Sequence, residues 1–154
     1  MHLDQIDRRL LTELQQDAGR SIEKLGELVG LSRNACWNRI RRLEEAGIIK
    51  ARVAIVDPNQ VNLGLSVFIA IRTNEHDPTW LETFAREVSA IREIQGVYRI
   101  AGDIDYLIKA RIPDVAAYDA LYQRLIRKVR LVDVSASFVM QEIKETTALT
   151  LDYA

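Results

Sequence analysis

The segment 32–47, SRNACWNRIRRLEEAG, constrains the fold of this chain most strongly because its helical projection has two chemically different faces. At 100° per residue, one face is a narrow apolar stripe of Cys36, Ile40 and Leu43. A serine at position 32 can cap the start of the helix, and a glycine at position 47 can end it. The opposite face is polar and consists of Asn34, Asn38, Arg41 and Glu45. The pattern predicts a helix that buries one side in a core and leaves the other side free.

The polar face carries side chains that can read bases in the major groove of DNA. Asparagine can pair bidentately with adenine and arginine with guanine, and Ser32 as N-cap leaves first-turn N–H groups for a phosphate. An ordinary surface helix with a solvated polar side is the alternative. The DNA interpretation covers residues on this helix and shortly after it, namely Ser32, Arg33, Asn34, Trp37, Asn38, Arg41, Arg42 and Arg52.

The distribution of charge favours the DNA interpretation. The net charge of −1 gives no global sign of a nucleic-acid partner, but residues 33–52 hold six basic side chains against two acidic ones. Residues 58–154 hold 11 basic side chains against 13 acidic ones. A local basic patch beside an acidic remainder is expected of a small DNA-binding module joined to another domain.

Two further predicted helices precede this segment and complete a helix-turn-helix pattern. Asp4 can cap a helix that reaches about Gln16, and Ser21 can cap a shorter helix that ends before Gly30. In three-helix DNA-binding units of this order, the last helix enters the major groove. The inward positions are Ile6, Leu10, Leu11 and Leu14 in the first helix and Ile22, Leu25, Leu28 and Val29 in the second.

The chain changes character after the third helix. Residues 48–58, IIKARVAIVDP, are β-branched and alternating enough to predict a strand, or a strand pair, that ends at the Asp57–Pro58 break. We place the domain boundary there. Residues 1–57 are expected to form a three-helix winged helix-turn-helix domain with a linker strand, and residues 58–154 a second domain.

The second domain has the element order β-α-β-β-α-β, which is the ferredoxin-like arrangement. One helix follows a turn at His76, and the other starts at Pro113–Asp114. The predicted fold class is therefore α+β. The tail, residues 142–151, has no evident place in one monomer and could cover another subunit. The expected strands cover residues 65–73, 97–101, 106–112 and 132–139.

Five segments in the right order resemble the Lrp/AsnC, or feast/famine, family of bacterial and archaeal transcription regulators. They are LDQIDRRLLTELQQDAGRS, LSRNACWNRIRRLEEAGII, VDPNQVNLGL, AGDIDYLIK and SFVMQEIKETTAL. The resemblance covers nearly the whole chain and implies an N-terminal DNA-binding domain. It also implies a C-terminal ferredoxin-like domain that assembles dimers, often into octamers, and binds an amino acid between subunits.

One part of the third helix departs from this family. Asn34–Ala35 stands where many members have Thr-Pro or Ser-Pro, and Trp37 is bulky. The operator sequence of relatives should therefore not be assumed for this chain.

The resemblance places the effector site at a hinge, residues 102–105. Gly102 permits a positive φ and close approach, so consecutive N–H groups there can hold the carboxylate of a free amino acid. Asp103 or Asp105 could balance its ammonium group. The alternative is that Gly-Asp is ordinary hairpin chemistry and that Asp105 caps the turn with its own backbone.

Three residues outside the hinge complete the expected effector site. Tyr106 could form a wall beside the side chain of the amino acid. Ser135 and Ser137, on one face of the last strand, could supply hydroxyl groups to the pocket, or they could be polar edge residues.

The ferredoxin-like half has two sheet edges and one uncovered apolar sheet face, which predicts a partner. A dimer is the expected minimum unit because two recognition helices about 34 Å apart are needed to read successive turns of one face of DNA. The resemblance implies further assembly to an octamer. The expected partners are thus double-stranded DNA, an amino acid and other copies of this chain.

Composition excludes several other classes of protein. No run of about 18 apolar residues could span a bilayer, and the N-terminus lacks the apolar stretch of a secretory signal, so we expect a cytoplasmic protein. Cys36, the single cysteine, rules out an internal disulfide. Because Cys36 lies on the apolar stripe, a buried small hydrophobe is favoured over a redox sensor.

The sequence indicates no cofactor, no metal and no catalytic residues. His2 and His76 lie in expected terminal and loop positions, and neither GxSxG nor a phosphate loop occurs. One enzyme alternative exists because sirohaem decarboxylases are similar to this same family. The resemblance implies that their chemistry uses C-terminal histidines, and here that domain has only His76.

Overall fold

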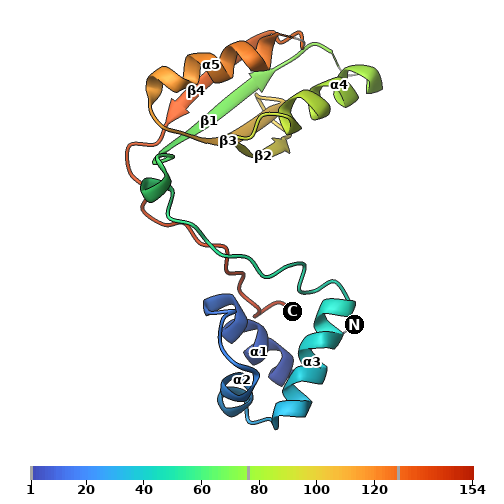
Figure 1. Ribbon diagram of the computed structural model, residues 1–154. Helices are drawn as coiled ribbons and strands as arrows, with labels where there is room; N and C mark the ends of the chain where they lie inside the picture. The colour runs from blue at the N-terminus through green and yellow to red at the C-terminus, as the bar shows by residue number, and fades with distance from the viewer. Residues whose placement is uncertain (1, 76, 128) are drawn as a thin grey trace. The chain divides into compact units, whose positions relative to one another are not determined.

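A computed structural model describes residues 2–75, 77–127 and 129–154, and the chain divides into two compact units (Figure 1). The helical unit comprises Met1–Ala54 and Ile143–Ala154, and the sheet unit comprises Ile55–Glu142. The turn expected at His76 lies outside the described residues. None of the helices described is long and apolar enough to cross a membrane.

The helical unit contains the three predicted helices, α1 (Gln5–Gln16), α2 (Ile22–Val29) and α3 (Arg33–Glu45). Their predicted N-caps are confirmed. The side chains of Asp4, Ser21 and Ser32 each accept a hydrogen bond from the backbone N–H three residues further on. These bonds satisfy donors that the first turn of a helix leaves without a partner.

Two glycines shape the turn between α2 and α3. Gly30 ends α2 with φ +76°, a left-handed conformation that a residue with a side chain rarely adopts. Gly26 lies within α2, and its carbonyl accepts a 2.8 Å hydrogen bond from the N–H of Leu31. A Cβ atom at Gly26 would lie 2.6 Å from the Leu31 carbonyl oxygen, so this close approach requires glycine.

The apolar stripe of α3 lies in the core of the helical unit, as predicted. Cys36, Ile40 and Leu43 are at most 2% exposed, and they pack with Leu10 and Leu25 from α1 and α2. Burial also raises the pKa of the Cys36 thiol, which disfavours the reactive thiolate. Cys36 therefore fills the core as a small apolar side chain.

The prediction of a strand in residues 48–58 is wrong. Residues 50–57 form no strand, so this segment provides no wing, and Val53, Ile55 and Val56 are 61–76% exposed. A strand is stabilised by its ladder, and no described strand of this chain pairs with the segment. A short 3-10 helix, η1 (Pro58–Val61), follows it and is capped by Asp57.

The C-terminal tail also differs from expectation, because its last part packs on the helical unit of its own chain. The Gln15 side-chain amide donates to the Leu149 carbonyl (3.1 Å) and accepts from the Leu149 N–H (2.7 Å). Leu151 packs against the apolar core of the helical unit. Residues 143–154, which the sequence suggested for the second domain, thus belong to the first compact unit.

The sheet unit is ferredoxin-like, as predicted. Its four strands are all antiparallel and lie in the order β2-β3-β1-β4 (Figure 1). In chain order the elements are β1 (Leu65–Arg72), α4 (Pro78–Ser89), β2 (Ile94–Arg99), β3 (Tyr106–Ile112), α5 (Val115–Ile126) and β4 (Asp133–Phe138).

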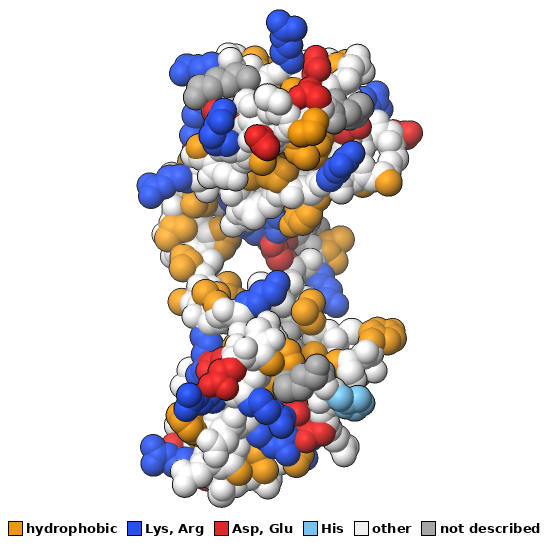
Figure 2. All heavy atoms as spheres, turned by 90° about the vertical axis from the view of Figure 1, so that its right-hand side faces the viewer, with side chains coloured by type: hydrophobic (Ala, Val, Ile, Leu, Met, Phe, Trp, Pro, Cys, Tyr) orange, Lys and Arg blue, Asp and Glu red, His pale blue; other side chains and the backbone are white. Residues whose placement is uncertain are grey.

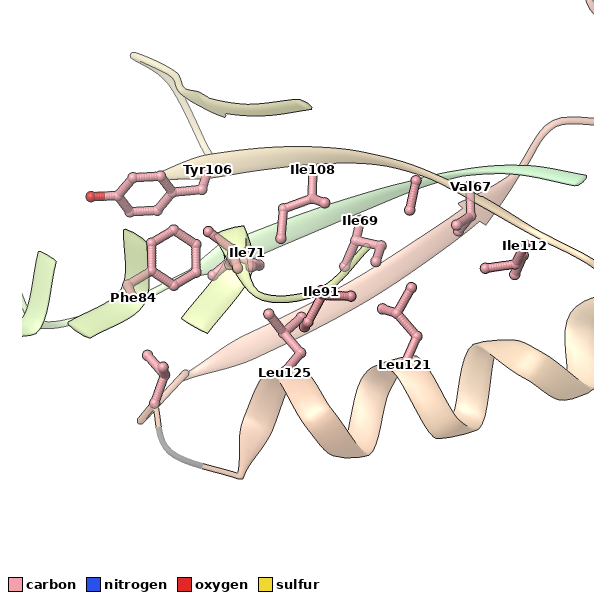
Figure 3. Close-up of a cluster of buried hydrophobic side chains, with 13 residues drawn as sticks. Val67, Ile69, Ile71, Phe84, Ile91, Tyr106, Ile108, Ile112, Leu121 and Leu125 are labelled. Atoms are coloured by element: carbon pink, nitrogen blue, oxygen red, sulfur yellow. The ribbon is translucent and has the colours of Figure 1, made fainter. Parts of the chain in front are cut away.

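Helices α4 and α5 cover the same face of the sheet, and the core lies between these helices and the sheet. Figure 3 shows Leu121 and Leu125 of α5 pointing toward the sheet, with Phe84 of α4 beside Tyr106 of β3. The inward residues of β1 are Val67, Ile69 and Ile71, and all three are fully buried. Within the described part of the sheet unit, no helix lies over the opposite face of the sheet (Figure 1).

Strand β2 begins and ends earlier than the predicted range 97–101. Its pairing with β3 shifts register between Ile94 and Gly96, and this irregularity hides the simple alternation of a strand. Beyond Arg99 the chain turns into the hinge, where the Ile100 N–H donates to the Asp105 carbonyl (2.9 Å).

Candidate nucleic-acid interface and effector site

The polar face of α3 is exposed as predicted. Asn34, Asn38, Arg41 and Glu45 are all solvent-exposed, opposite the buried stripe. Ser32 and Arg33 are exposed at the start of the helix. After the cap at Ser32, other N–H groups of the first turn lack an intrahelical partner and can meet an anion. This surface offers amide, guanidinium and backbone donors on one side of one helix.

Trp37 lies on this exposed side, with 49% of its surface accessible. The guanidinium carbon of Arg41 is 5.4 Å from the centroid of the Trp37 ring, which is within the range of a cation–π contact. Arg41 Nε also donates to Glu45 Oε1 at 2.7 Å. Arg41 thus contacts two neighbouring side chains of the outer face.

Other cations of the predicted patch have carboxylate partners. Arg33 Nε lies 2.8 Å from Glu23 Oε1, and Arg52 Nη2 lies 2.5 Å from Glu44 Oε1. On the face of the helical unit shown in Figure 2, Lys and Arg side chains lie beside Asp and Glu side chains. The patch is therefore less positive than a count of its basic residues suggests.

Arg42 is held by a carboxylate that the sequence did not point to. Its Nη2 donates to both oxygens of Asp7, at 2.9 and 2.7 Å, while Arg39 Nη1 donates to Asp7 Oδ1 at 2.8 Å. Asp7 is only 1% exposed, whereas the Arg42 side chain is 50% exposed. Arg42 thus joins α3 to α1 and still reaches solvent.

Asp4 extends this cluster at the start of α1. Asp4 and Asp7 each accept a hydrogen bond from the other's backbone N–H. The hydrogen bond from the Asp7 N–H, and then the Arg39 side chain 2.6 Å away, lower the pKa of the Asp4 carboxyl below its ordinary value. The charged form of Asp4 is therefore favoured in the folded protein.

The hinge is tied to the end of β1 by hydrogen bonds. The Asp105 carboxylate accepts from the Thr73 N–H at 2.8 Å, and the Asp105 N–H donates to the Ile71 carbonyl at 2.9 Å. Arg72 Nε donates to the Asp103 carbonyl at 2.7 Å. Gly102 is exposed and has φ +147°. Asp105 thus has a capping role, toward β1 rather than toward its own turn.

Tyr106 lies in the core layer under α4 rather than at the exposed hinge. It is 5% exposed, and its ring is 4.8 Å from Phe84 and 5.7 Å from Trp80, centroid to centroid. It also lines an open hollow of about 430 Å³ between α4 and β2, together with Leu81, Phe84, Ala85, Val88, Ser89, Ile94, Gln95, Gly96, Val97 and Arg99.

Arg99 is a residue of this hollow that the sequence did not single out. Its guanidinium can donate hydrogen bonds to the carboxylate of a ligand. The alternation of β2 was obscured by its register shift, so no sequence signal marked Arg99 as lining a cavity.

The two serines lie on the other side of the sheet from Tyr106. Ser135 pairs with Ala70 and Ser137 with Phe68, both on the face without helices, and both serines are exposed. The structure therefore separates the expected effector residues within one chain. Gly102, Asp103 and Asp105 share the hinge, Tyr106 is below α4, and the serines are on the open face.

The described residues contain no group of three or more His, Cys, Asp or Glu side chains that could hold a metal ion.

Two family models match the chain. Residues 3–44 match the AsnC-type helix-turn-helix domain, and residues 66–149 match the Lrp/AsnC ligand binding domain. The chain belongs to the Lrp/AsnC family.

Similar proteins include regulators of this Lrp/AsnC family from several bacteria. The glutamate uptake regulatory protein of Zymomonas mobilis is 47% identical over 97% of this chain and 91% of its own length. An AsnC family regulator from Agrobacterium tumefaciens superposes with a TM-score of 0.95 at 46% identity, covering 98% of this chain and 99% of that one. A Neisseria meningitidis regulator in complex with L-methionine superposes with a TM-score of 0.94 at 33% identity, covering 99% of each chain.

In this Lrp/AsnC chain we expect Asp7→Ala to lower the free energy of unfolding by about 1–3 kcal/mol, because it removes charge-assisted bonds from Arg39 and Arg42. Both arginines keep contact with solvent, which weakens their ion pairs with Asp7 and limits the loss of stability. Urea unfolding at pH 7 would measure the change.

The matched control is Glu27→Ala, which removes an exposed carboxylate 3.1 Å from Lys24 Nζ. It should change the unfolding free energy by less than about 0.5 kcal/mol. An equal effect of the two substitutions would show that the Asp7 cluster does not stabilise the helical unit.

Proposed function

We propose that this Lrp/AsnC protein is a transcription regulator that binds double-stranded DNA sequence-specifically through α3. The observation that carries the proposal is the exposed outer face of α3, from which Asn34, Asn38 and Arg41 project. Their amide and guanidinium groups match the edges of adenine and guanine. Because the apolar stripe is used by the core, the polar face of this third helix is free for the major groove.

The ion pairs around α3 are compatible with phosphate binding. The side chains of the Arg33–Glu23 and Arg52–Glu44 pairs are 39–71% exposed. Exposed pairs of this kind contribute only about 0–1 kcal/mol, so a phosphate can replace the carboxylate at small cost. Arg42 can contact a phosphate with its exposed edge while Asp7 holds the other.

We predict that Asn38→Ala or Arg41→Ala loses about 1–3 kcal/mol of discrimination at one or two base positions. Arg52→Ala, expected to contact phosphate, should weaken binding to all sequences alike and flatten the salt dependence. Binding selections from randomised duplex DNA, followed by salt titrations, would measure both effects.

The matched control is Arg86→Ala, which removes an exposed arginine from α4 of the sheet unit. It should leave sequence preference and salt slope unchanged. If both α3 variants keep the wild-type preferred sequence, α3 is not the reading helix.

We further propose that the chain assembles through the open face of its sheet into a dimer, and from dimers into an octamer. That face carries partly or well exposed apolar side chains, including Phe68, Leu107 and Tyr98, the last 54% exposed. Along each strand these residues alternate with the residues that point toward the core. An uncovered apolar sheet face usually meets a partner.

We predict that light scattering at micromolar concentration gives at least a dimer of the 17.6 kDa chain. Tyr98→Glu should weaken this assembly because it places a charge on the open face. The control is Val115→Glu, at an apolar position on α5 that is similarly exposed (59%), and it should leave the assembly unchanged. A wild-type monomer would contradict the proposal.

The small effector of this regulator is proposed to be an amino acid bound by the sheet unit. The matching family model is named a ligand binding domain, and the similar Neisseria regulator binds L-methionine. The hinge offers N–H groups and two carboxylates, and the hollow beside it offers Arg99 and apolar walls. To regulate DNA binding, the effector must prefer one assembly state, typically by about 1–3 kcal/mol.

No observation favours the enzyme alternative. The single histidine of the sheet unit, His76, lies outside the described residues.

A melting screen of the 20 amino acids should reveal the effector, since a ligand at 100 times its Kd stabilises by roughly 2.7 kcal/mol. We predict that Asp105→Asn, which can keep an acceptor for the Thr73 N–H, removes the response of DNA binding to this amino acid. Gly102→Val should do the same because valine resists φ +147°. DNA affinity without effector should persist in both variants.

Calorimetric titration of the amino acid into each variant, with and without DNA, is the measurement. If only Arg99→Ala loses binding of the amino acid, the binding site is the hollow and not the hinge. Loss of DNA affinity in the hinge variants would mean that the hinge is structural.

A further inference from the structure

Trp37 is an exposed aromatic side chain that the core of the helical unit does not use. The buried residues of α3 are Cys36, Ile40 and Leu43, and the apolar cluster of this unit does not include Trp37. A half-exposed indole leaves a large apolar surface in water, which is unfavourable unless a partner covers it. Its position on the outer face puts that surface among polar groups suited to bases.

Two contacts hold the guanidinium of Arg41 in one place. The Trp37 ring lies beside it, with 5.4 Å from the guanidinium carbon to the ring centroid, and Glu45 accepts from its Nε at 2.7 Å. Both partners are four residues away along the helix, where side chains meet. Because Glu45 occupies Nε, the two terminal nitrogens of Arg41 remain for another acceptor.

The remaining edge of Arg41 fits a guanine. Two parallel N–H groups match the O6 and N7 acceptors that guanine presents in the major groove. An arginine that is already oriented loses less side-chain freedom on binding than a free one. Trp37 and Glu45 therefore have a positioning role for Arg41.

The exposed part of the Trp37 ring has its own complement in the major groove. The apolar group that base pairs present there is the C5-methyl of thymine. A ring that stacks with Arg41 can contact this methyl group on a base pair next to the guanine.

We propose that Trp37, Arg41 and Glu45 form one reading unit, in which Trp37 and Glu45 orient Arg41 toward a guanine and Trp37 contacts the methyl group of a neighbouring thymine. This inference rests on the proposed function of α3 as the DNA-reading helix. It makes Trp37 a specificity-determining residue for a guanine–thymine element.

The test uses the full-length chain and the duplex that it prefers in a selection from randomised DNA. Replacing thymine by deoxyuridine removes only the methyl group, and replacing guanine by 7-deazaguanine removes the N7 acceptor. Fluorescence anisotropy at fixed salt gives Kd for each duplex. Wild type should lose roughly 5- to 150-fold on the 7-deazaguanine duplex and bind the deoxyuridine duplex measurably more weakly.

The variants separate the two roles of Trp37. Trp37→Ala should bind thymine and deoxyuridine duplexes equally and reduce the penalty for 7-deazaguanine by about 2- to 5-fold, the size of an exposed cation–π contact. Glu45→Ala should reduce only the 7-deazaguanine penalty, and Trp37→Phe should keep part of both effects. Tyr153→Ala, which removes an aromatic that is 94% exposed outside α3, is the control and should change neither.

A direct readout comes from tryptophan fluorescence. Trp80→Phe leaves Trp37 as the single tryptophan of the chain, and its emission should change on titration with the preferred duplex. Unchanged base discrimination in Trp37→Ala, or a preferred duplex without adjacent guanine and thymine, would overturn the reading unit but leave DNA binding by α3 intact. Failure of wild type to prefer any duplex would overturn the proposed function as well.

Discussion

The arrangement of the helical unit depends on one buried carboxylate. Asp7 accepts hydrogen bonds from Arg39 and Arg42 of α3, and it also closes the cap at the start of α1. A charge that is 1% exposed is unfavourable unless it is paired and hydrogen-bonded. Both requirements are met only when α1 and α3 lie together in this orientation. The same bonds therefore stabilise the helices and fix the orientation of the polar face of α3.

Electrostatics on α3 divides its arginines into two groups. Arg39 and Arg42 point toward α1, where Asp4 and Asp7 compensate their charge. Arg33 and Arg41 lie on exposed surface with exposed glutamates as partners. Glu23 compensates the charge of Arg33 in the free protein, so a bound phosphate must offer Arg33 better contacts than this exposed pair does.

Local signals made much of the fold predictable. The caps at Asp4, Ser21 and Ser32 each depend on a side chain and an N–H three residues away, so the sequence alone contains them. The ranges of β1 and β3 likewise followed from the local sequence pattern. By contrast, residues 48–58 have the composition of a strand, but composition cannot show whether a partner strand exists. The contact of Asp7 with Arg42, 35 residues apart, is long-range and left no local pattern.

The candidate effector site was less predictable for the same reason. Gly102, Asp103 and Asp105 are neighbours in sequence and lie together at the hinge. Whether Tyr106 and the serines of β4 join them depends on strand register, and the observed register puts them on opposite faces of the sheet. Arg99 was missed because the irregularity at Gly96 interrupts the pattern of β2.

The return of the C-terminal tail means that the helical unit is not one contiguous segment of the chain, although the helix-turn-helix within it is. Residues 143–154 follow the sheet unit in the sequence but pack with residues 1–54, through the Gln15–Leu149 bonds and the partial burial of Leu151. The helical unit therefore cannot acquire all its contacts until the entire sheet unit has left the ribosome. A fusion that borrows only the first 54 residues would leave the site of Leu151 uncovered, so a designer of hybrid regulators would have to supply the last segment in trans or by circular permutation.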